Sequence, residues 1–175
     1  MKKPKLLLLD ANVVIHLFEL GIWTEVITRH KVHLAKTVVE QEARYYEDTS
    51  GTRHYIDLSD DIDAGRIQVF EESPSHLMAF RDSFDPSYVE RLDAGETESL
   101  VHLLRETEDC RICSADKIVF RILGKLLRSE QGISLEEVLD QMGFGRPLAR
   151  QYSKAYREEW TRRGFAESLG GLGRR

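Results

Sequence analysis

Four consecutive leucines, Leu6–Leu9, stand near the start of the chain and are followed at once by Asp10. An apolar run of this length without alternation predicts a strand buried on both faces, as in a parallel sheet with helices on each side. The run is too short for an export signal or a membrane span, and no later stretch approaches the length of a span. We therefore expect an α/β protein that is cytoplasmic and has no membrane partner.

Strand-like and helix-like segments alternate through the first part of the 175-residue chain. Residues 11–27 have apolar side chains near helical spacing, and Thr37 and Glu40 have the spacing of a capping box at the start of a helix over 37–46. Residues 48–65 are polar and rich in turn formers, which favours a loop or insertion. The other expected strands are 32–34, 66–71 and 110–116, and the other expected helices are 75–83, 86–92, 93–106 and 117–127. This alternation predicts an α/β fold with a mainly parallel central sheet.

The last part of the chain differs from this pattern. Ser134 and Glu137 have capping-box spacing at the start of a short helix, and Pro147 opens a further predicted helix. Apolar side chains recur about every four residues along it, at Leu148, Tyr152, Tyr156 and Trp160. Such a stripe either packs on its own domain or docks on a partner. We therefore predict a domain at 1–127 and a C-terminal helical extension at 128–175, which contacts that domain or a partner.

Charge is distributed unevenly along the chain. The net charge is −5; residues 146–175 hold eight Lys and Arg against three Glu, a balance of +5, so residues 1–145 carry −10. An acidic body with a basic tail suits an enzyme of nucleic acids, in which acids hold metal ions and basic side chains contact phosphate. Solvated helix faces can produce the same distribution without any such function.

Cys110 and Cys113 form a CxxC motif. A zinc site needs two further ligands with similar local spacing, and no such pair exists in the sequence. We predict that these residues are two thiols within a strand.

Two aspartates follow predicted strands, Asp10 after 5–9 and Asp116 at the end of 110–116. Functional groups in parallel α/β sheets gather outside the carboxyl ends of the strands, so these carboxylates face one crevice if their strands are neighbours. Glu96, in the first turn of its helix, and Glu42, on the inner side of another, would join them. Four converging carboxylates need positive charge between them, and an all-oxygen site suits Mg²⁺ or Mn²⁺.

Each of these acids also has a purely structural explanation. Asp10 and Asp116 stand where a turn or a helix N-cap often has an aspartate. Glu96 has the spacing to complete a capping box with Asp93, and Glu42 could be an ordinary surface acid. The metal-site prediction depends on the four acids together and on their order.

The order of these segments resembles the PIN-domain family, which includes the toxin ribonucleases of bacterial toxin–antitoxin pairs. The segments that carry the resemblance are LLLLDANVVIHL at 6–17, VVEQEA at 38–43, DAGETESLVHLL at 93–104 and CRICSADKIVFRIL at 110–123. In that family the first strand ends in an Asp, as at Asp10, and a Gly-Glu pair opens a later helix in one branch, as at Glu96. A final Asp follows a strand, often two places after Ser or Thr, as at Asp116 with Ser114.

The resemblance covers roughly residues 5–127, and two of its features are open. The family's second acid corresponds to Glu40 or Glu42. We prefer Glu42, because Glu40 is accounted for by the predicted capping box. The family's last strand has no clear counterpart, although GISLEEVL at 132–139 could contain its remnant.

The resemblance implies a three-layer PIN-like fold and a metal-dependent endoribonuclease. Asp10, Glu96 and Asp116 would then bind Mg²⁺ or Mn²⁺, and Glu42 would hold a second ion or orient a water molecule. Asn12 and Ser114 would donate hydrogen bonds that fix the carboxylates. The cations expected to contact the RNA backbone are Arg150, Lys154 and Arg157. An antitoxin protein and a homodimer are the implied protein partners.

Two other functions stay open. The fold could serve as a binding module with little or no nuclease activity, acting through the aromatic stripe of the tail helix. It could also belong to a phosphate-handling enzyme such as a phosphatase, although such enzymes usually have a second Asp where this chain has Asn12. Nucleotide hydrolysis is not favoured, because the sequence contains no glycine-rich phosphate loop.

Overall fold

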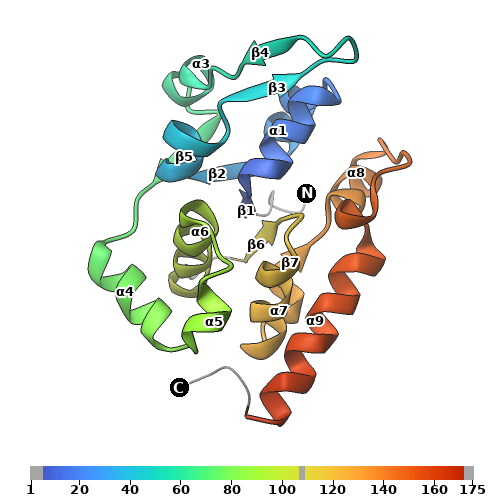
Figure 1. Cartoon of the computed structure of the whole chain (residues 1–175). Coiled ribbons are helices and arrows are strands. Elements are labelled where there is room, and N and C mark those ends of the chain that lie inside the picture. Colours follow the sequence, from blue (N-terminus) through green and yellow to red (C-terminus); the bar gives the residue numbers. More distant parts are fainter. Residues whose placement is uncertain (1–5, 107–108, 172–175) are drawn as a thin grey trace.

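The computed structural model describes residues 6–106 and 109–171. Its central sheet has five strands in the order β5-β2-β1-β6-β7, and all neighbouring pairs are parallel. The strands are β1 (Leu6–Leu9), β2 (Lys31–Ala35), β5 (Ile67–Phe70), β6 (Cys110–Cys113) and β7 (Gly132–Ile133). The prediction of an α/β fold with a mainly parallel sheet is confirmed (Figure 1).

The leucines of β1 show how the sheet is covered. Successive side chains of a strand point to opposite faces, and all four leucines are buried. Leu7 and Leu9 join one apolar core, whereas Leu6 and Leu8 join the other. The first core includes α1 (Ala11–Glu19), α2 (Trp23–Arg29) and α8 (Leu135–Met142). The second includes α4 (Pro74–Asp82), α5 (Pro86–Val89), α6 (Ala94–Arg105) and α7 (Lys117–Lys125). The sheet therefore lies between helices on both faces.

The strand order reverses between β1 and β6. β1 is followed by β2 and β5 on one side, and β6 is followed by β7 on the other. In open parallel sheets, ligand sites lie outside the carboxyl ends of the strands at such a reversal. Asp10 directly follows β1, and Asp116 comes shortly after β6. The fold therefore brings these two predicted acids to the same edge of the sheet.

The single helix expected over 11–27 is two helices, α1 and α2. Gly21 lies between them with φ +67°, a left-handed conformation that glycine adopts without steric strain. Trp23 then starts α2, and its Nε1 donates a hydrogen bond to Asp61 Oδ2 at 2.8 Å. The turn at Gly21 lets both helices pack on the same face of the sheet.

The helix expected over 37–46 is also wrong in its length and its cap. Thr37 makes no side-chain capping bond, and the helical segment is the π-helix η1 (Val38–Glu42). The Ala43 backbone N–H bonds the Val38 carbonyl five residues earlier at 2.9 Å. The capping-box explanation for Glu40 therefore fails, and Glu40 is exposed to solvent.

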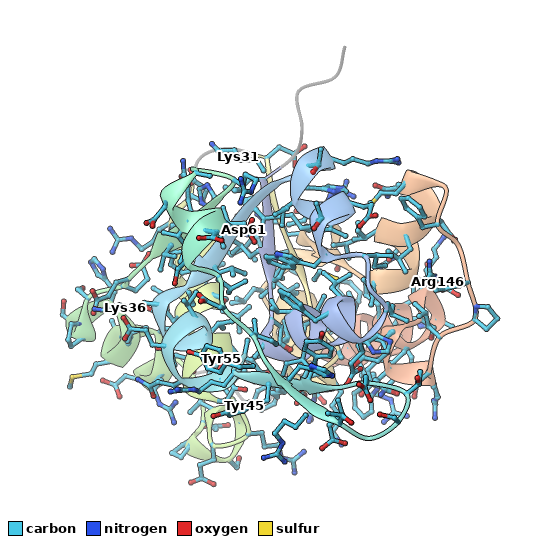
Figure 2. All side chains as sticks on the ribbon, turned by 90° about the horizontal axis from the view of Figure 1, so that it is seen from above. Lys31, Lys36, Tyr45, Tyr55, Asp61 and Arg146 are labelled. Atoms are coloured by element: carbon cyan, nitrogen blue, oxygen red, sulfur yellow. The ribbon has the colours of Figure 1, made fainter. Side chains whose placement is uncertain are left out.

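Residues 48–65, expected to be a loop, contain regular structure. β3 (Tyr45–Glu47) pairs antiparallel with β4 (Arg53–Tyr55), and α3 (Ser59–Asp63) follows. The turn closes because Asp48 Oδ1 accepts hydrogen bonds from the backbone N–H groups of Ser50 and Thr52. The exposed rings of Tyr45 and Tyr55 meet across the hairpin with centroids 5.6 Å apart (Figure 2).

The tail beyond residue 127 contributes to the central sheet. After the short 3-10 turn η2 (Ser129–Gln131), β7 pairs with β6, and α8 begins with the predicted capping box of Ser134 and Glu137. The last helix does not begin at Pro147 as expected, because the 3-10 turn η3 (Arg150–Tyr152) comes before it. It begins at Lys154 as α9 (Lys154–Leu169), because the Ser153 hydroxyl caps it by accepting from the Tyr156 N–H.

Helix α9 packs along α7 (Figure 1), and its predicted apolar stripe is used inside the chain. Tyr152 stacks on His16 with ring centroids 4.3 Å apart. Tyr156 and Trp160 pack against the core of α4 to α7. The stripe is therefore not an open docking surface.

Both cysteines are buried thiols of β6, as predicted. Burial is the largest cause of a raised pKa at Cys113, so its nucleophilic thiolate form is disfavoured. Within the described ranges, no helix combines the length and the apolar character needed to cross a membrane.

Candidate metal centre

Asp10 is the innermost acid of the candidate site. Its backbone N–H bonds the Cys113 carbonyl at 3.0 Å, which ties the end of β1 to the end of β6. The side chain is 2% exposed. Its Oδ2 accepts a hydrogen bond from Ser114 Oγ at 3.0 Å, whereas its Oδ1 is buried and has no hydrogen-bond partner. A buried carboxylate oxygen without a partner is costly unless something positive contacts it.

Glu96 lies beside Asp10 at the start of α6 and is also 2% exposed. It completes a capping box: Asp93 Oδ1 accepts from the Glu96 N–H at 2.7 Å, and Glu96 Oε2 accepts from the Asp93 N–H at 3.1 Å. Oxygens of Asp10, Asp93 and Glu96 all lie within 4.8 Å of one another. The capping role and the site role of Glu96 are therefore compatible.

Asp93 is a further candidate ligand, although its sequence pattern indicates only a helix cap. A capping box places the side chains of the N-cap and N3 residues at the same end of the helix. An N-cap Asp therefore comes close to whatever its partner Glu approaches. Because Asp93 and Glu96 have capping-box spacing and Glu96 is a predicted ligand, the sequence could have predicted Asp93 as a second ligand from the same helix end.

Asp116 and Ser114 connect the end of β6 to the cluster. The Asp116 N–H donates to Ser114 Oγ at 3.0 Å, and the same hydroxyl donates to Asp10. Asp116 Oδ1 accepts from the Ile118 N–H at 2.8 Å, so Asp116 is also the N-cap of α7. Its negative charge helps to raise the pKa values of Asp10 and Glu96. Ser114 is thus a bridge between two of the predicted ligands.

Glu42, rather than Glu40, points toward α6. Glu42 Oε1 accepts a hydrogen bond from the Gly95 N–H at 3.0 Å, while its Oε2 is buried with no hydrogen-bond partner. A Cβ at Gly95 would lie 2.2 Å from Glu42 Oε2. The absence of a side chain at Gly95 is therefore what allows Glu42 to approach the start of α6. Glu42, the preferred second acid, therefore lies beside α6. The preference for it rested on a capping role of Glu40 that the structure does not show.

The other predicted site residues lie outside this cluster. Asn12 is exposed on α1 and, among the described residues, makes no hydrogen bond with the carboxylates. Arg150 and Arg157 form ion pairs, at 2.7 Å each, with Glu159 and Glu137. Lys154 Nζ lies 3.8 Å from Glu158 Oε1. The charges of these three tail cations are therefore partly compensated within the chain.

The electrostatics of the cluster favour protonated carboxyls. Burial, followed by the charge of Asp93, raises the pKa of Asp10 from 3.8 to about 7. Burial, followed by the charges of Asp10 and Asp93, raises the pKa of Glu96 from 4.5 to about 9. Burial is likewise the largest cause of the raised pKa values of Asp93 and Glu42. Like charges in a buried space disfavour ionisation unless a cation lies among them.

These residues fit a hard divalent cation. Asp10, Asp93 and Glu96 supply only oxygen atoms, and their spacing would allow them to bind one ion together. The unpartnered Oδ1 of Asp10 is available for such contact. These three acids could therefore hold a metal ion. Together with Asp116 and Glu42, which adjoin them through the hydrogen bonds of Ser114 and Gly95, they are called the acidic cluster.

Removing the Ser114 hydroxyl tests how the cluster is held. We expect Ser114→Ala to weaken metal binding by about 10–100-fold, the usual effect of losing a hydrogen-bond partner of a metal ligand. The Ser114 hydrogen bond also lowers the pKa of Asp10, so its loss makes deprotonation of that ligand harder. Calorimetric titration with Mn²⁺ measures the change, with Ser87→Ala, an exposed serine of α5, as the matched control. Equal affinities of the two variants would contradict the role given to Ser114.

Comparison of the chain with protein-family models, with curated proteins and with solved structures finds no match.

Proposed function

We propose that the chain is a metal-dependent endoribonuclease of the PIN type, acting at the acidic cluster. The observation that carries the proposal is the convergence of the Asp10, Asp93 and Glu96 oxygens within 4.8 Å, at the point where the strand order of a parallel sheet reverses. Sites at this position of an α/β sheet bind ligands. The resemblance of four sequence segments to PIN domains supports the choice of RNA as substrate.

The residues of the cluster have distinct roles in this proposal. Asp10, Asp93 and Glu96 would hold Mg²⁺ or Mn²⁺, with Asp116 completing the set. A divalent ion held by these residues would lower the pKa of a water molecule and stabilise charge on the phosphodiester. Ser114 keeps Asp10 and the start of α7 in register through its two hydrogen bonds. Glu42, held by the Gly95 N–H, would orient the attacking water or contact a second ion.

The alternative binding module has less support than the nuclease. Such a module would need the aromatic stripe of the tail helix as a free surface, but Tyr152, Tyr156 and Trp160 pack inside the chain. A toxin role, an antitoxin partner and a homodimer stay predictions from the resemblance.

The direct test is cleavage of a mixed RNA pool by the purified chain in Mg²⁺ or Mn²⁺, with EDTA as the control. We expect cleavage that requires metal and that produces internal cuts in circular as well as linear RNA. Absence of cleavage by folded protein with both metals would contradict the nuclease proposal. The same assay on single-stranded DNA shows whether the ribose hydroxyl matters.

The raised pKa values make a prediction about pH. Metal binding requires deprotonated carboxylates, and the pKa values of Asp10 and Glu96 are about 7 and about 9 in the metal-free site. Metal affinity should therefore increase as the pH rises through about 7 toward about 9, and binding should release protons. Calorimetric titrations in buffers of different ionisation enthalpy measure both effects. Affinity that does not change across this pH range would show that the carboxyls are already ionised.

A further inference from the structure

A pocket adjoins the acidic cluster on its α7 side. It has a volume of about 420 Å³ and is lined by Arg91, Asp116, Lys117, Ile118 and Arg121. Asp116 belongs to both the pocket and the cluster. Two of the cations are also close to cluster acids in sequence, since Lys117 follows Asp116 and Arg91 precedes Asp93 by two residues. The site is therefore acidic at its centre and basic beside it.

Arg121 is the fixed part of this pocket. Its Nε and Nη2 donate to Glu167 Oε1 at 2.9 and 2.5 Å, and its guanidinium lies 4.6 Å from the Tyr88 ring centroid. Tyr88 also donates a hydrogen bond to Glu167. Burial lowers the pKa of Arg121, and the nearby charges of Arg91 and Arg163 lower it further. Positive side chains are thus crowded together at this place.

Arg91 and Lys117 supply the uncompensated charge. Both are exposed, and neither forms an ion pair with any residue in the described ranges. Lys117 Nζ lies 5.3 Å from the Trp160 ring centroid, which restrains it near the pocket. The negative charge of Asp116 would be directed to a metal ion in the proposed site. The positive charges of Arg91 and Lys117 would then be left to attract an anion.

The flank of the cluster at Glu42 has the reverse character. The pocket there is lined by the acids Glu19, Glu42 and Glu47 and by a single cation, Arg53. Arg53 is itself 3.8 Å from Glu47. A polyanion is repelled from this flank and attracted to the other. The difference gives the site a preferred side for additional phosphates.

We propose that Arg91 and Lys117, with Arg121 behind them, bind a backbone phosphate of the nucleic-acid strand next to the phosphate that reacts at the acidic cluster. The inference rests on the proposed function and adds a positioning site to it. Contacts of this kind hold the strand in place and carry no sequence information. The three tail cations expected to meet RNA are less suited to the role, because they are paired with glutamates.

Binding of a short fluorescein-labelled single-stranded RNA to the full chain tests the pocket. Asp10→Asn prevents cleavage during the measurement, and Arg91→Ala or Lys117→Ala is added to it. Each addition should weaken binding by about tenfold, the usual effect of losing a charged hydrogen bond. Each should also reduce the slope of log affinity against log salt by about 0.7, the value for one phosphate contact on a single strand.

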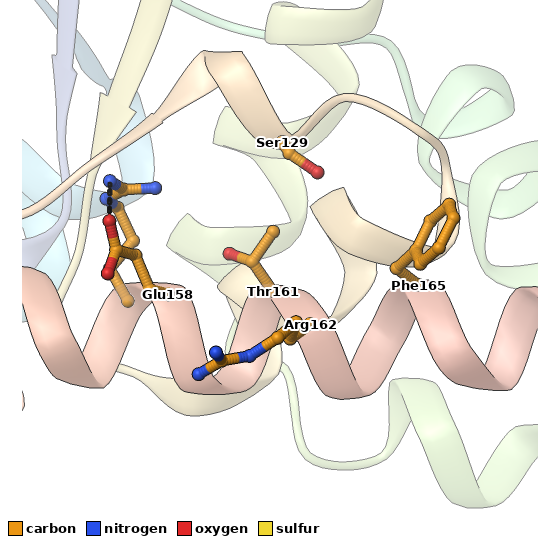
Figure 3. A pocket seen from close by; sticks show the side chains of 6 residues that line it. Ser129, Glu158, Thr161, Arg162 and Phe165 are labelled. Atoms are coloured by element: carbon orange, nitrogen blue, oxygen red, sulfur yellow. Dashed lines mark ion pairs between the residues drawn. The ribbon is translucent and has the colours of Figure 1, made fainter.

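Arg162→Ala is the matched control. Arg162 is an exposed arginine of α9 that lines a different pocket, together with Ser129, Thr161 and Phe165 (Figure 3). It should leave both affinity and salt slope unchanged. A set of RNAs, each with one phosphate replaced by a neutral methylphosphonate, locates the contact. When the replaced phosphate is the one that Arg91 binds, Arg91→Ala should cause no further loss of affinity, whereas at every other position it should still weaken binding. Affinity and salt slope unchanged by Arg91→Ala would overturn the proposal.

Failure of the pocket and failure of the nuclease give different results. If wild type cleaves RNA with metal and Arg91→Ala has the same KM and salt dependence, the pocket assignment is wrong and the nuclease stands. If wild type binds RNA through Arg91 without cleaving it, the phosphate pocket stands and the nuclease is wrong. If wild type does not bind RNA, the pocket is not a strand site.

Discussion

Asp10→Asn is expected to abolish metal-dependent RNA cleavage and to raise the melting temperature of the metal-free protein. Asparagine keeps the shape of Asp10 and can still accept the Ser114 hydrogen bond, but it removes a negative ligand from the centre of the cluster. Losing a partner of a ligand already costs about 10–100-fold, so losing the ligand itself should cost at least about 100-fold in rate. The fold should be retained.

The gain in stability follows from the pKa of Asp10. Burial raises it from 3.8 to about 7, so the folded state binds the proton more tightly than the unfolded state. The stability that comes with the protonated carboxyl is present below pH 3.8 and is lost as the pH rises through about 7. The substituted asparagine cannot ionise and keeps this stability, so the variant should be more stable above about pH 7, by at most about 4 kcal/mol.

Thermal unfolding in EDTA, measured below and above about pH 7, tests the stability half of this prediction. Asp63→Asn is the control, because Asp63 is an exposed residue of α3. Figure 2 shows Asp61 of that helix toward the side of Lys31, the first residue of β2, and away from Tyr45 and Tyr55. The control should change neither activity nor the pH dependence. Cleavage by Asp10→Asn at the wild-type rate would refute the metal-site assignment.

Gly164→Ala is expected to destabilise the protein strongly through the contact between α7 and α9. A Cβ at Gly164 would lie 1.8 Å from the Arg121 carbonyl oxygen, and one at Gly124 would lie 2.0 Å from the Thr161 carbonyl oxygen. Both obstacles are backbone atoms, so the helices must move apart. That movement also strains the Arg121 to Glu167 ion pair.

Overpacking against backbone atoms costs about 3 kcal/mol, the upper end of the usual range, and the better helix propensity of alanine recovers about 1 kcal/mol of this. The net loss of about 2 kcal/mol should lower the melting temperature by about 4–8 °C for a chain of this size. Gly145→Ala is the matched control, because its Cβ would meet only the end of the flexible Asp140 side chain. If Gly164→Ala and Gly145→Ala have the same melting temperature, the close crossing of α7 and α9 is not a source of stability.

Local patterns in the sequence identified the elements that depend on local physics. The uninterrupted leucines of β1 predict a strand buried on both faces, and Leu6 and Leu7 do lie on opposite faces of the sheet. The capping box of Ser134 and Glu137 correctly predicts the start of α8, because both hydrogen bonds are made within four residues. Patterns of this range need no knowledge of distant contacts.

Long-range contacts decided the features that the sequence reasoning missed. Thr37 and Glu40 have capping-box spacing, yet η1 takes another shape, with Glu42 held by the N–H of Gly95, 53 residues away. Arg157 lies in the basic tail, but Glu137 of α8 pairs with it. In both cases a partner far along the chain changes what a local pattern would otherwise favour.

The sequence by itself determined the alternation of strands and helices, and it placed Asp10 and Asp116 after strands. Only the tertiary structure decided that β1 and β6 are neighbours, which brings these acids to one edge of the sheet. It also brought Asp93 into the cluster and a basic pocket beside it. The physical reason is that hydrogen bonds and apolar spacing act between nearby residues, whereas a site depends on which strands pair and which helices cross.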